Sequence, residues 1–188
     1  MGTIKTTNIE PIADNGTVTL GSSGDTFTFA SGVTGINYPA FQAYKNATQD
    51  VSDATTTVVS FEVEKFDTNN AYDTSTYRFT PQVAGKYFIY AQVTGNPSGS
   101  QNIEKMSAFF FKNGTQESQA RQESPDYDAS EITVFHSVIL DLNGSSDYVD
   151  VRGNQDVSSG TPRFAGDSGA SASVGGLRTY FGAYRIGT

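Results

Sequence analysis

Apolar and polar residues alternate over short stretches from residue 39 onward, with the period of two that is typical of half-buried β-strands. Residues 58–66 (VVSFEVEKF) place apolar side chains on one face and Ser and Glu on the other. Residues 86–93 (KYFIYAQV) and 179–186 (TYFGAYRI) are apolar on both faces instead. Both are predicted to be covered on both sides, and a second copy of the chain is the expected cover for the last strand.

Turn residues divide the chain into a series of expected strands. Asn113-Gly114 and Asn143-Gly144 are the dipeptides most favoured in tight hairpins, and Pro81 marks a strand end. The expected strands are 39–46, 58–66, 77–81, 86–93, 106–115, 131–142, 147–153 and 176–186. Polar or Gly-rich loops are expected at 67–77, 95–102, 116–130 and 153–176. Strands at this spacing predict an all-β sandwich or jelly roll of eight to ten strands.

Residues 1–35 have a different pattern and are predicted to form a β-rich attachment arm. Thr alternates with apolar residues in TVTL (17–20) and TFTF (26–29), and a Gly-Ser-Ser-Gly turn lies between them. The segment has too few apolar residues to fold alone, so it is expected to pack on the main domain, on sister chains or on a larger partner. The apolar residues expected to make these contacts are Val18, Leu20, Phe27 and Phe29.

Composition and charge narrow the classes of function. The chain has 13 Phe and 10 Tyr but no Cys, so disulfides and thiolate sites are excluded. Its net charge of −8 repels phosphate backbones, and a nucleic-acid partner is not expected. No stretch approaches the length of a membrane span, and the first residues contain no apolar signal region. The chain is therefore expected to have no membrane partner and to be made in the cytoplasm without a signal peptide.

From about residue 38 to 186 the chain resembles the globular head of the first complement component and the related tumour necrosis factor jelly roll. The matching motifs follow one another in order: PAFQAY (39–44), FDTNNAYDTSTYRFTP (66–81), VAGKYF (83–88), FKNG (111–114), SVILDL (137–142) with DYVDV (147–151), and YFGAYRI (180–186). The resemblance implies a ten-stranded jelly roll over residues 36–188 that assembles as a homotrimer. Its first and last strands would lie near the three-fold axis, with an interface that includes Phe41, Tyr44, Tyr180, Phe181 and Tyr184.

The arm followed by this head also resembles virion proteins of phages, cyanophages in particular. This second resemblance implies a non-enzymatic structural protein, a homotrimeric fibre or fibre-tip head on the virion surface, made in the host cytoplasm. The arm would bind other tail or capsid proteins, and the head would bind a host cell-surface glycan or protein. A capsid decoration (cement) protein and a soluble lectin-like trimeric ligand remain alternatives. A glycan-degrading enzyme is the weakest alternative, because no pair of carboxylates stands out.

The search for catalytic or metal chemistry favours structural roles. The sequence contains no nucleotide-binding, serine-hydrolase or zinc-protease motif. His136 is the single histidine; a satisfied or interface histidine is expected, with an ion-binding cluster on a three-fold axis as the alternative. No cofactor is expected; calcium bound by loop carboxylates such as Asp67 stays open. The residues expected in ligand-binding loops are Tyr72, Asp73, Asp126 and Tyr127.

Overall fold

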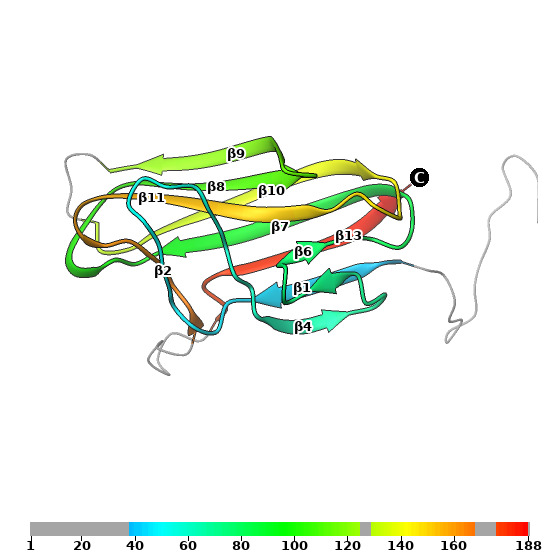
Figure 1. The fold of residues 1–188 in the computed structure, drawn as a ribbon, viewed down its shortest axis with the longest axis horizontal. Coiled ribbons are helices and arrows are strands. Elements are labelled where there is room, and N and C mark those ends of the chain that lie inside the picture. Colours follow the sequence, from blue (N-terminus) through cyan, green and yellow to red (C-terminus); the bar gives the residue numbers. More distant parts are fainter. Residues whose placement is uncertain (1–37, 125–128, 168–175, 188) are drawn as a thin grey trace, which may run out of the picture. The chain divides into compact units, whose positions relative to one another are not determined.

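The computed structural model describes residues 38–124, 129–167 and 176–187, which form two antiparallel β-sheets (Figure 1). The first sheet is built around β7 (Gly85–Gly95), which pairs with β13 (Tyr180–Gly187) along one edge and with β10 (Ile132–Leu142) along the other. β7 is therefore the central strand that its two apolar faces predict.

The remaining strands of the first sheet lie beyond β13 and beside the end of β7. β1 (Ala40–Tyr44) pairs with β13, and β4 (Val63–Asp67) pairs with β1. The two-residue strands β2 (Gln49–Asp50) and β12 (Arg163–Phe164) pair with each other, and β12 also pairs with Gly95 of β7. β13 thus lies between β1 and β7. One of its faces packs on the core, while Tyr184 on the other is exposed, so a second copy as the cover of that face stays a prediction.

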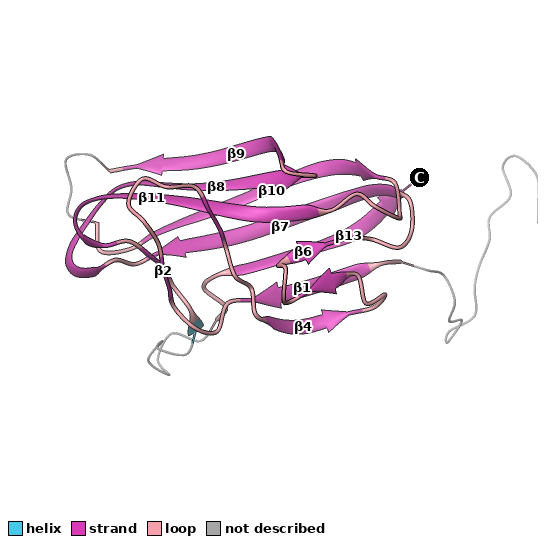
Figure 2. Cartoon of the chain, viewed as in Figure 1, coloured by secondary structure: helices cyan, strands magenta, loops and turns pink. Residues whose placement is uncertain are grey.

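The second sheet has β8 (Ser98–Lys112) between β9 (Thr115–Glu123) and β11 (Val149–Thr161). Short strands complete it on the far side of β11: β3 (Thr57–Val58), β5 (Tyr72–Asp73) and β6 (Arg78–Phe79). Figure 2 shows that strands and loops make up nearly all of the described chain, which confirms the all-β class. No helix among these residues has the length and apolarity to cross a membrane.

The two sheets enclose a core of stacked and edge-on aromatic rings. Phe41 of β1 lies 4.5 Å from Phe79 and 4.9 Å from Phe181 between ring centroids, and Phe181 contacts Phe61 at 5.6 Å. All four side chains are fully buried. Each contributes about 1.5–3 kcal/mol through burial, and ring geometry adds to this. The core therefore joins the first and last strands of the domain to the opposite sheet.

All four expected loops are wrong in part, and so is the expected strand 58–66, which is two short strands, β3 and β4, in different sheets. Residues 67–77 contain β5. Residues 116–130 contain most of β9, and residues 153–176 contain the end of β11 and all of β12. Residues 95–102 contain the end of β7 and the start of β8, so a short turn replaces the expected loop. β9 is mostly exposed on both faces and forms a polar edge strand. Its backbone pairing with β8 holds it in place, and such a strand carries no apolar alternation in its sequence.

The attachment arm at 1–35, with Val18, Leu20, Phe27 and Phe29, lies outside the described residues, so the arm and its boundary stay predictions. The expected count of ten strands also stays a prediction, because several described strands have two residues.

Replacing a core ring at the centre of this cluster tests the packing. We expect Phe181→Ala to lower the free energy of unfolding by about 3–5 kcal/mol, because it leaves a cavity between the sheets. Phe181→Leu is the matched control and should lower the free energy of unfolding markedly less, since leucine fills much of the same volume. Urea unfolding followed by circular dichroism, at one chain concentration, measures both. Equal losses for the two variants would contradict the packing described above.

Candidate functional site: an uncharged aromatic sheet face

The face of the first sheet that points away from the core carries a second set of aromatic side chains. Strand register places them in three rows, each crossing β1, β13, β7 and β10. The first row is Ala40, Tyr184, Phe88 and Ile139; the second, which continues to β4, is Phe66, Gln42, Gly182, Tyr90 and Ser137; the third is Tyr44, Tyr180, Gln92 and Phe135. These three rows are called the outer face below.

The first row is apolar and open to solvent. Phe88 lies 5.4 Å from Tyr184 between ring centroids and 6.1 Å from Tyr90 in the next row. Tyr184 is 46% exposed and Ile139 is 56% exposed, which is high for side chains of this kind within a sheet. Contiguous exposed apolar side chains mark surfaces that bind another molecule.

The second row depends on a missing side chain at its centre. A Cβ atom added to Gly182 would lie 2.5 Å from the Tyr90 Cζ and hydroxyl oxygen, so the Tyr90 ring lies directly over the Gly182 backbone. The Gln42 Nε2 group donates a hydrogen bond of 3.3 Å to the Tyr90 hydroxyl. Glycine at this position therefore flattens the middle of the outer face and holds the Tyr90 ring against it.

The third row links the aromatic rings to a polar network. The Tyr180 hydroxyl donates to Gln92 Oε1 at 3.4 Å, and Gln92 Nε2 donates to the carbonyl oxygen of Arg178 at 2.9 Å. The Tyr180 ring lies 6.2 Å from that of Tyr90. The side-chain oxygen and nitrogen of Gln92 thus each have a hydrogen-bond partner within the protein, so neither needs water to satisfy it.

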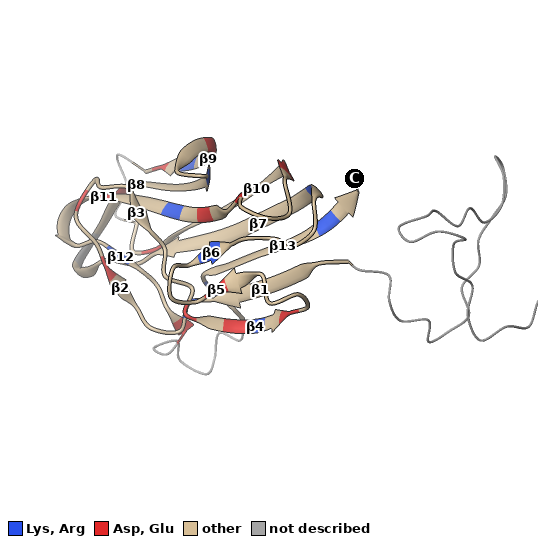
Figure 3. Cartoon of the chain, turned by 45° about the vertical axis from the view of Figure 1, so that its right-hand side comes forward, with Lys and Arg blue, Asp and Glu red and all other residues tan. Residues whose placement is uncertain are grey.

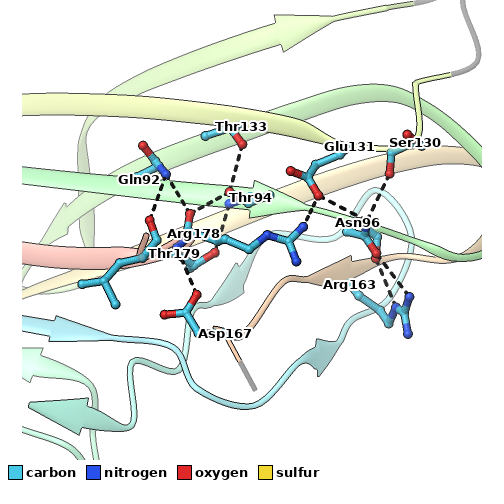
Figure 4. Close-up of polar contacts among 11 residues, drawn as sticks. Gln92, Thr94, Asn96, Ser130, Glu131, Thr133, Arg163, Asp167, Arg178 and Thr179 are labelled. Atoms are coloured by element: carbon cyan, nitrogen blue, oxygen red, sulfur yellow. Dashed lines mark hydrogen bonds and ion pairs between the residues drawn. The ribbon is translucent and has the colours of Figure 1, made fainter. Parts of the chain in front are cut away.

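Figure 4 shows how this network fixes the start of β13. The carbonyl oxygen of Arg178 also accepts a 2.7 Å bond from Thr94 Oγ1, which lies 2.9 Å from Thr133 Oγ1. The Arg178 amide donates to Asp167 Oδ1 at 3.0 Å, and its guanidinium pairs with Glu131. Because β7 and β10 both take part, the network sets the position at which β13 joins the sheet.

Electrostatics make the outer face suited to burial. None of the residues in the three rows carries a charge. The charged residues of β7, β10 and β13, which are Lys86, Asp141 and Arg185, lie toward one end of these strands, and others lie on β4, β9 and β11 (Figure 3). Burial raises the pKa of the Tyr90 and Tyr180 hydroxyls, so both stay neutral hydrogen-bond donors at neutral pH. Removing water from an uncharged surface costs little free energy when its polar groups are already hydrogen-bonded within the protein.

The predicted interface residues divide between the two faces of the sheet. Tyr44, Tyr180 and Tyr184 lie on the outer face. Phe41 and Phe181 are fully buried in the core of the chain itself, so their assignment to an interface is wrong. The reason is the period of two: in β1 and β13 every second residue points into the sandwich, and these two do.

The predicted ligand-loop residues do not form one site. Tyr72 is 4% exposed, stacks on Phe41 in the core and donates a 2.9 Å hydrogen bond to the carbonyl oxygen of Phe61, so its role as a surface ligand contact is wrong. Burial raises the pKa of its hydroxyl. Asp73 is exposed beside it. Asp126 and Tyr127 lie outside the described residues and stay predictions.

Asp67 and Asp73, two loop carboxylates that could bind calcium, accept hydrogen bonds within their own turns. Asp67 accepts hydrogen bonds from the backbone amides of Asn69, Ala71 and Tyr72 at 2.6–3.0 Å. Asp73 accepts from the Ser75 hydroxyl and amide at 2.6 and 2.7 Å and from the Thr76 hydroxyl at 2.9 Å. Within the described residues no group of three or more potential metal ligands occurs. These acids shape the loop, which is the ordinary role of Asp in turns.

His136 points toward the core and lies on the same side of β10 as Val134 and Val138, as its sequence position predicts. It stacks on Phe110 at 5.1 Å, and its Nε2 atom lies 2.9 Å from Ser118 Oγ of β9. Burial lowers its pKa. This is a satisfied structural histidine. The alternative of an ion-binding histidine cluster on a three-fold axis stays a prediction.

Several outer-face residues were absent from the predicted interface: Phe66, Phe88, Tyr90, Phe135 and Ile139. Their apolar character is visible in the sequence, but their common face follows from the register of four strands. Gln42 and Gln92 gave no sequence signal, because their role is to bond the tyrosine hydroxyls beside them.

Comparison with solved structures identifies the fold. The globular domain of zebrafish complement 1qA protein is 15% identical with a TM-score of 0.54, over 79% of this chain and 97% of that one. Eiger TNF from S. frugiperda is 14% identical with a TM-score of 0.54, over 79% and 92%. Murine APRIL is 10% identical with a TM-score of 0.56, over 80% and 100%. The fold is therefore the jelly-roll sandwich of complement-head and TNF-like domains, as the sequence motifs implied.

No family model matches the chain, and no curated protein matches it in sequence. The likeness to solved structures accordingly shows the fold alone, and function has to be argued from the outer face.

The Asp73 turn gives a prediction for pH dependence. The Ser75 side-chain and backbone hydrogen bonds, followed by that of Thr76, lower the pKa of Asp73 to about 2 from its usual 3.8. The turn is then stabilised above pH about 4, and this contribution is lost as the pH falls toward about 2. Carboxyl ¹³C NMR should show the low midpoint, and Ser75→Ala should raise it. Thr74→Ala, next to the turn, is the control and should leave it unchanged. A midpoint near 3.8 in the unaltered chain would contradict the bonding.

Proposed function

We propose that the chain is a non-enzymatic homotrimeric head whose three copies associate through the outer face. The observation that carries this proposal is the uncharged aromatic surface on β1, β13, β7 and β10, with Phe66, Phe135, Ile139 and Tyr184 each 45–56% exposed. An exposed apolar sheet face of this kind is a liability for an isolated chain, and covering it by association removes the liability.

A cyclic arrangement of three copies accounts for the asymmetry of the outer face. Phe66 lies on β4 at one edge of the sheet, and Phe135 and Ile139 lie on β10 at the other. When one edge contacts the opposite edge of a neighbour, the contact is heterologous and needs a rotation that closes into a ring. The jelly roll of the complement-head and TNF type supports a ring of three. Three identical loop sets would then face outward and bind repeated ligands with avidity.

The place of this head in a larger particle is the finer part of the proposal. The combination of the VTLGSSGDTFTF arm with this head supports a virion structural protein of a phage, either a fibre head or a capsid decoration protein. In this proposal residues 1–35 attach the head to other virion proteins, and the head binds a host surface glycan or protein. A free soluble trimeric ligand is the alternative, which would have no particle partner.

The assembly is tested by mass in solution. We expect light scattering at micromolar concentration to give about three times the chain mass of 20.1 kDa. Tyr184→Asp should raise the dissociation constant by about 100-fold or more, because it buries an unpaired charge between copies. Thr115→Asp, which puts the same charge at an exposed position of the other sheet, is the matched control and should stay trimeric. If the unaltered chain is a soluble, folded monomer at this concentration, the proposal is wrong.

The attachment role is tested separately by deleting residues 1–35. The truncated head should remain trimeric, because the outer face is intact, but should no longer be incorporated into particles of the parent phage. Electron microscopy of labelled particles measures incorporation. Normal incorporation of the truncated head would overturn the attachment role, and release of free trimers by infected cells would favour the soluble ligand.

A further inference from the structure

A pocket of about 600 Å³ lies at the end of the sandwich where β7 begins and where β8, β10 and β13 end. Ala84 and Leu142 form an apolar part of its lining, and four charged side chains contribute to the rest of it. These are Lys112, Asp141, Asp147 and Arg185. None of these residues belongs to the three rows of the outer face. Its volume falls in the range of small-molecule sites.

Two of the four charges in the pocket lining, those of Lys112 and Asp147, neutralise each other. Lys112 Nζ lies 3.0 Å from Asp147 Oδ2 and also donates to the carbonyl oxygen of Asp141 at 2.7 Å. Asp147 accepts further bonds from Asn113 Nδ2 at 2.7 Å and from the Asn143 amide at 3.0 Å. The Asn113 bond is the main reason that the pKa of Asp147 lies below its usual value. This pair is a fixed, charge-balanced part of the wall.

The Asp141 carboxylate, which also lines the pocket, has a cation of its own. It lies 3.5 Å from Lys86 Nζ in the exposed rim. The acids of the lining are therefore each matched by a lysine, and neither is available to neutralise the remaining guanidinium.

Arg185 is held in place but keeps its charge available. Its backbone amide donates to the Pro39 carbonyl oxygen at 3.0 Å, and its Nε group donates to the Ala84 carbonyl oxygen at 3.0 Å. Gly85 makes room for it, because a Cβ atom there would lie 2.6 Å from Arg185 Nε. Across the described residues the guanidinium forms no ion pair, and its terminal nitrogens have no hydrogen-bond acceptor. It is partly buried, so the charge is not fully hydrated.

We propose that this pocket binds a small organic carboxylate with a short apolar body. The terminal nitrogens of Arg185 would donate two parallel hydrogen bonds to the carboxylate, which is the geometry that a guanidinium favours. Ala84 and Leu142 would contact the apolar body. Because Lys112 and Lys86 already neutralise Asp147 and Asp141, Arg185 leaves one unmatched positive charge at the pocket. A ligand with a single negative charge matches it, whereas a doubly charged ligand such as a phosphate monoester would keep one charge without a partner.

The probe is 4-fluorobenzoate, titrated into the full chain and observed by ¹⁹F NMR, with the neutral 4-fluorobenzamide as the matched ligand. We expect saturable binding of the benzoate with a dissociation constant of about 1 mM or tighter, and at least about tenfold weaker binding of the benzamide. Inorganic phosphate should compete weakly or not at all.

Two variants and one control locate the site. Arg185→Gln should weaken benzoate binding by about tenfold or more, since it removes the charged fork. Ala84→Phe keeps Arg185 but fills the pocket from an exposed position, so it should also abolish binding. This variant tests the site even if Arg185→Gln fails to fold. Arg121→Gln, which removes an exposed arginine paired with Glu123 on the other sheet, should bind like the unaltered chain.

The proposal is overturned by any of three results. These are no saturation by about 10 mM benzoate, equal binding of benzoate and benzamide, or unchanged binding in Ala84→Phe. None of these results bears on the mass of the assembled protein, so the pocket and the trimer can fail independently.

Discussion

The whole domain depends on how β13 is held between β1 and β7. Its inward residues, Phe181 and Ala183, close the aromatic core, while Tyr180 and Tyr184 on the opposite side form the middle of the outer face. Because side chains alternate along a strand, packing Phe181 into the core fixes which tyrosines point outward. A shift of one residue would exchange the two sets, so the core and the outer face are set by a single register.

Two features outside the core protect that register. The Tyr90 ring packs directly on the Gly182 backbone, and any side chain at position 182 would prevent this contact. The network around Arg178 and Thr94 fixes the start of β13 by bonds to β7, β10 and the Asp167 carboxylate. Steric fit in the middle of the strand and directional hydrogen bonds at its start therefore act together.

The sequence predicted the class of fold and most long strands well, because apolar alternation and Asn-Gly turns are local signals. It could not decide between Phe181 and Tyr184 for the interface, since both alternating sets of β13 are aromatic and hydrophobicity alone does not separate them. Register with β7 separates them, and register is a long-range property. Tyr72 was misplaced for a related reason: it lies in a polar stretch, yet Asp67 folds that stretch so that the ring reaches the core. β9 was missed because an exposed edge strand needs no apolar residues.

The contrast between the outer face and the end pocket follows from the same topology. Strands that run side by side present a broad surface on which every charge can be left out, and such a surface suits another protein. The ends of strands gather loop amides and charged side chains around a smaller space, where a few polar groups can select a small ligand. Arg185 stands where the two meet: it belongs to β13, but its position opposite Tyr87 turns it toward the end of the core and away from the tyrosine rows. In the two proposals, one strand thus serves association through its outward residues and ligand recognition through Arg185.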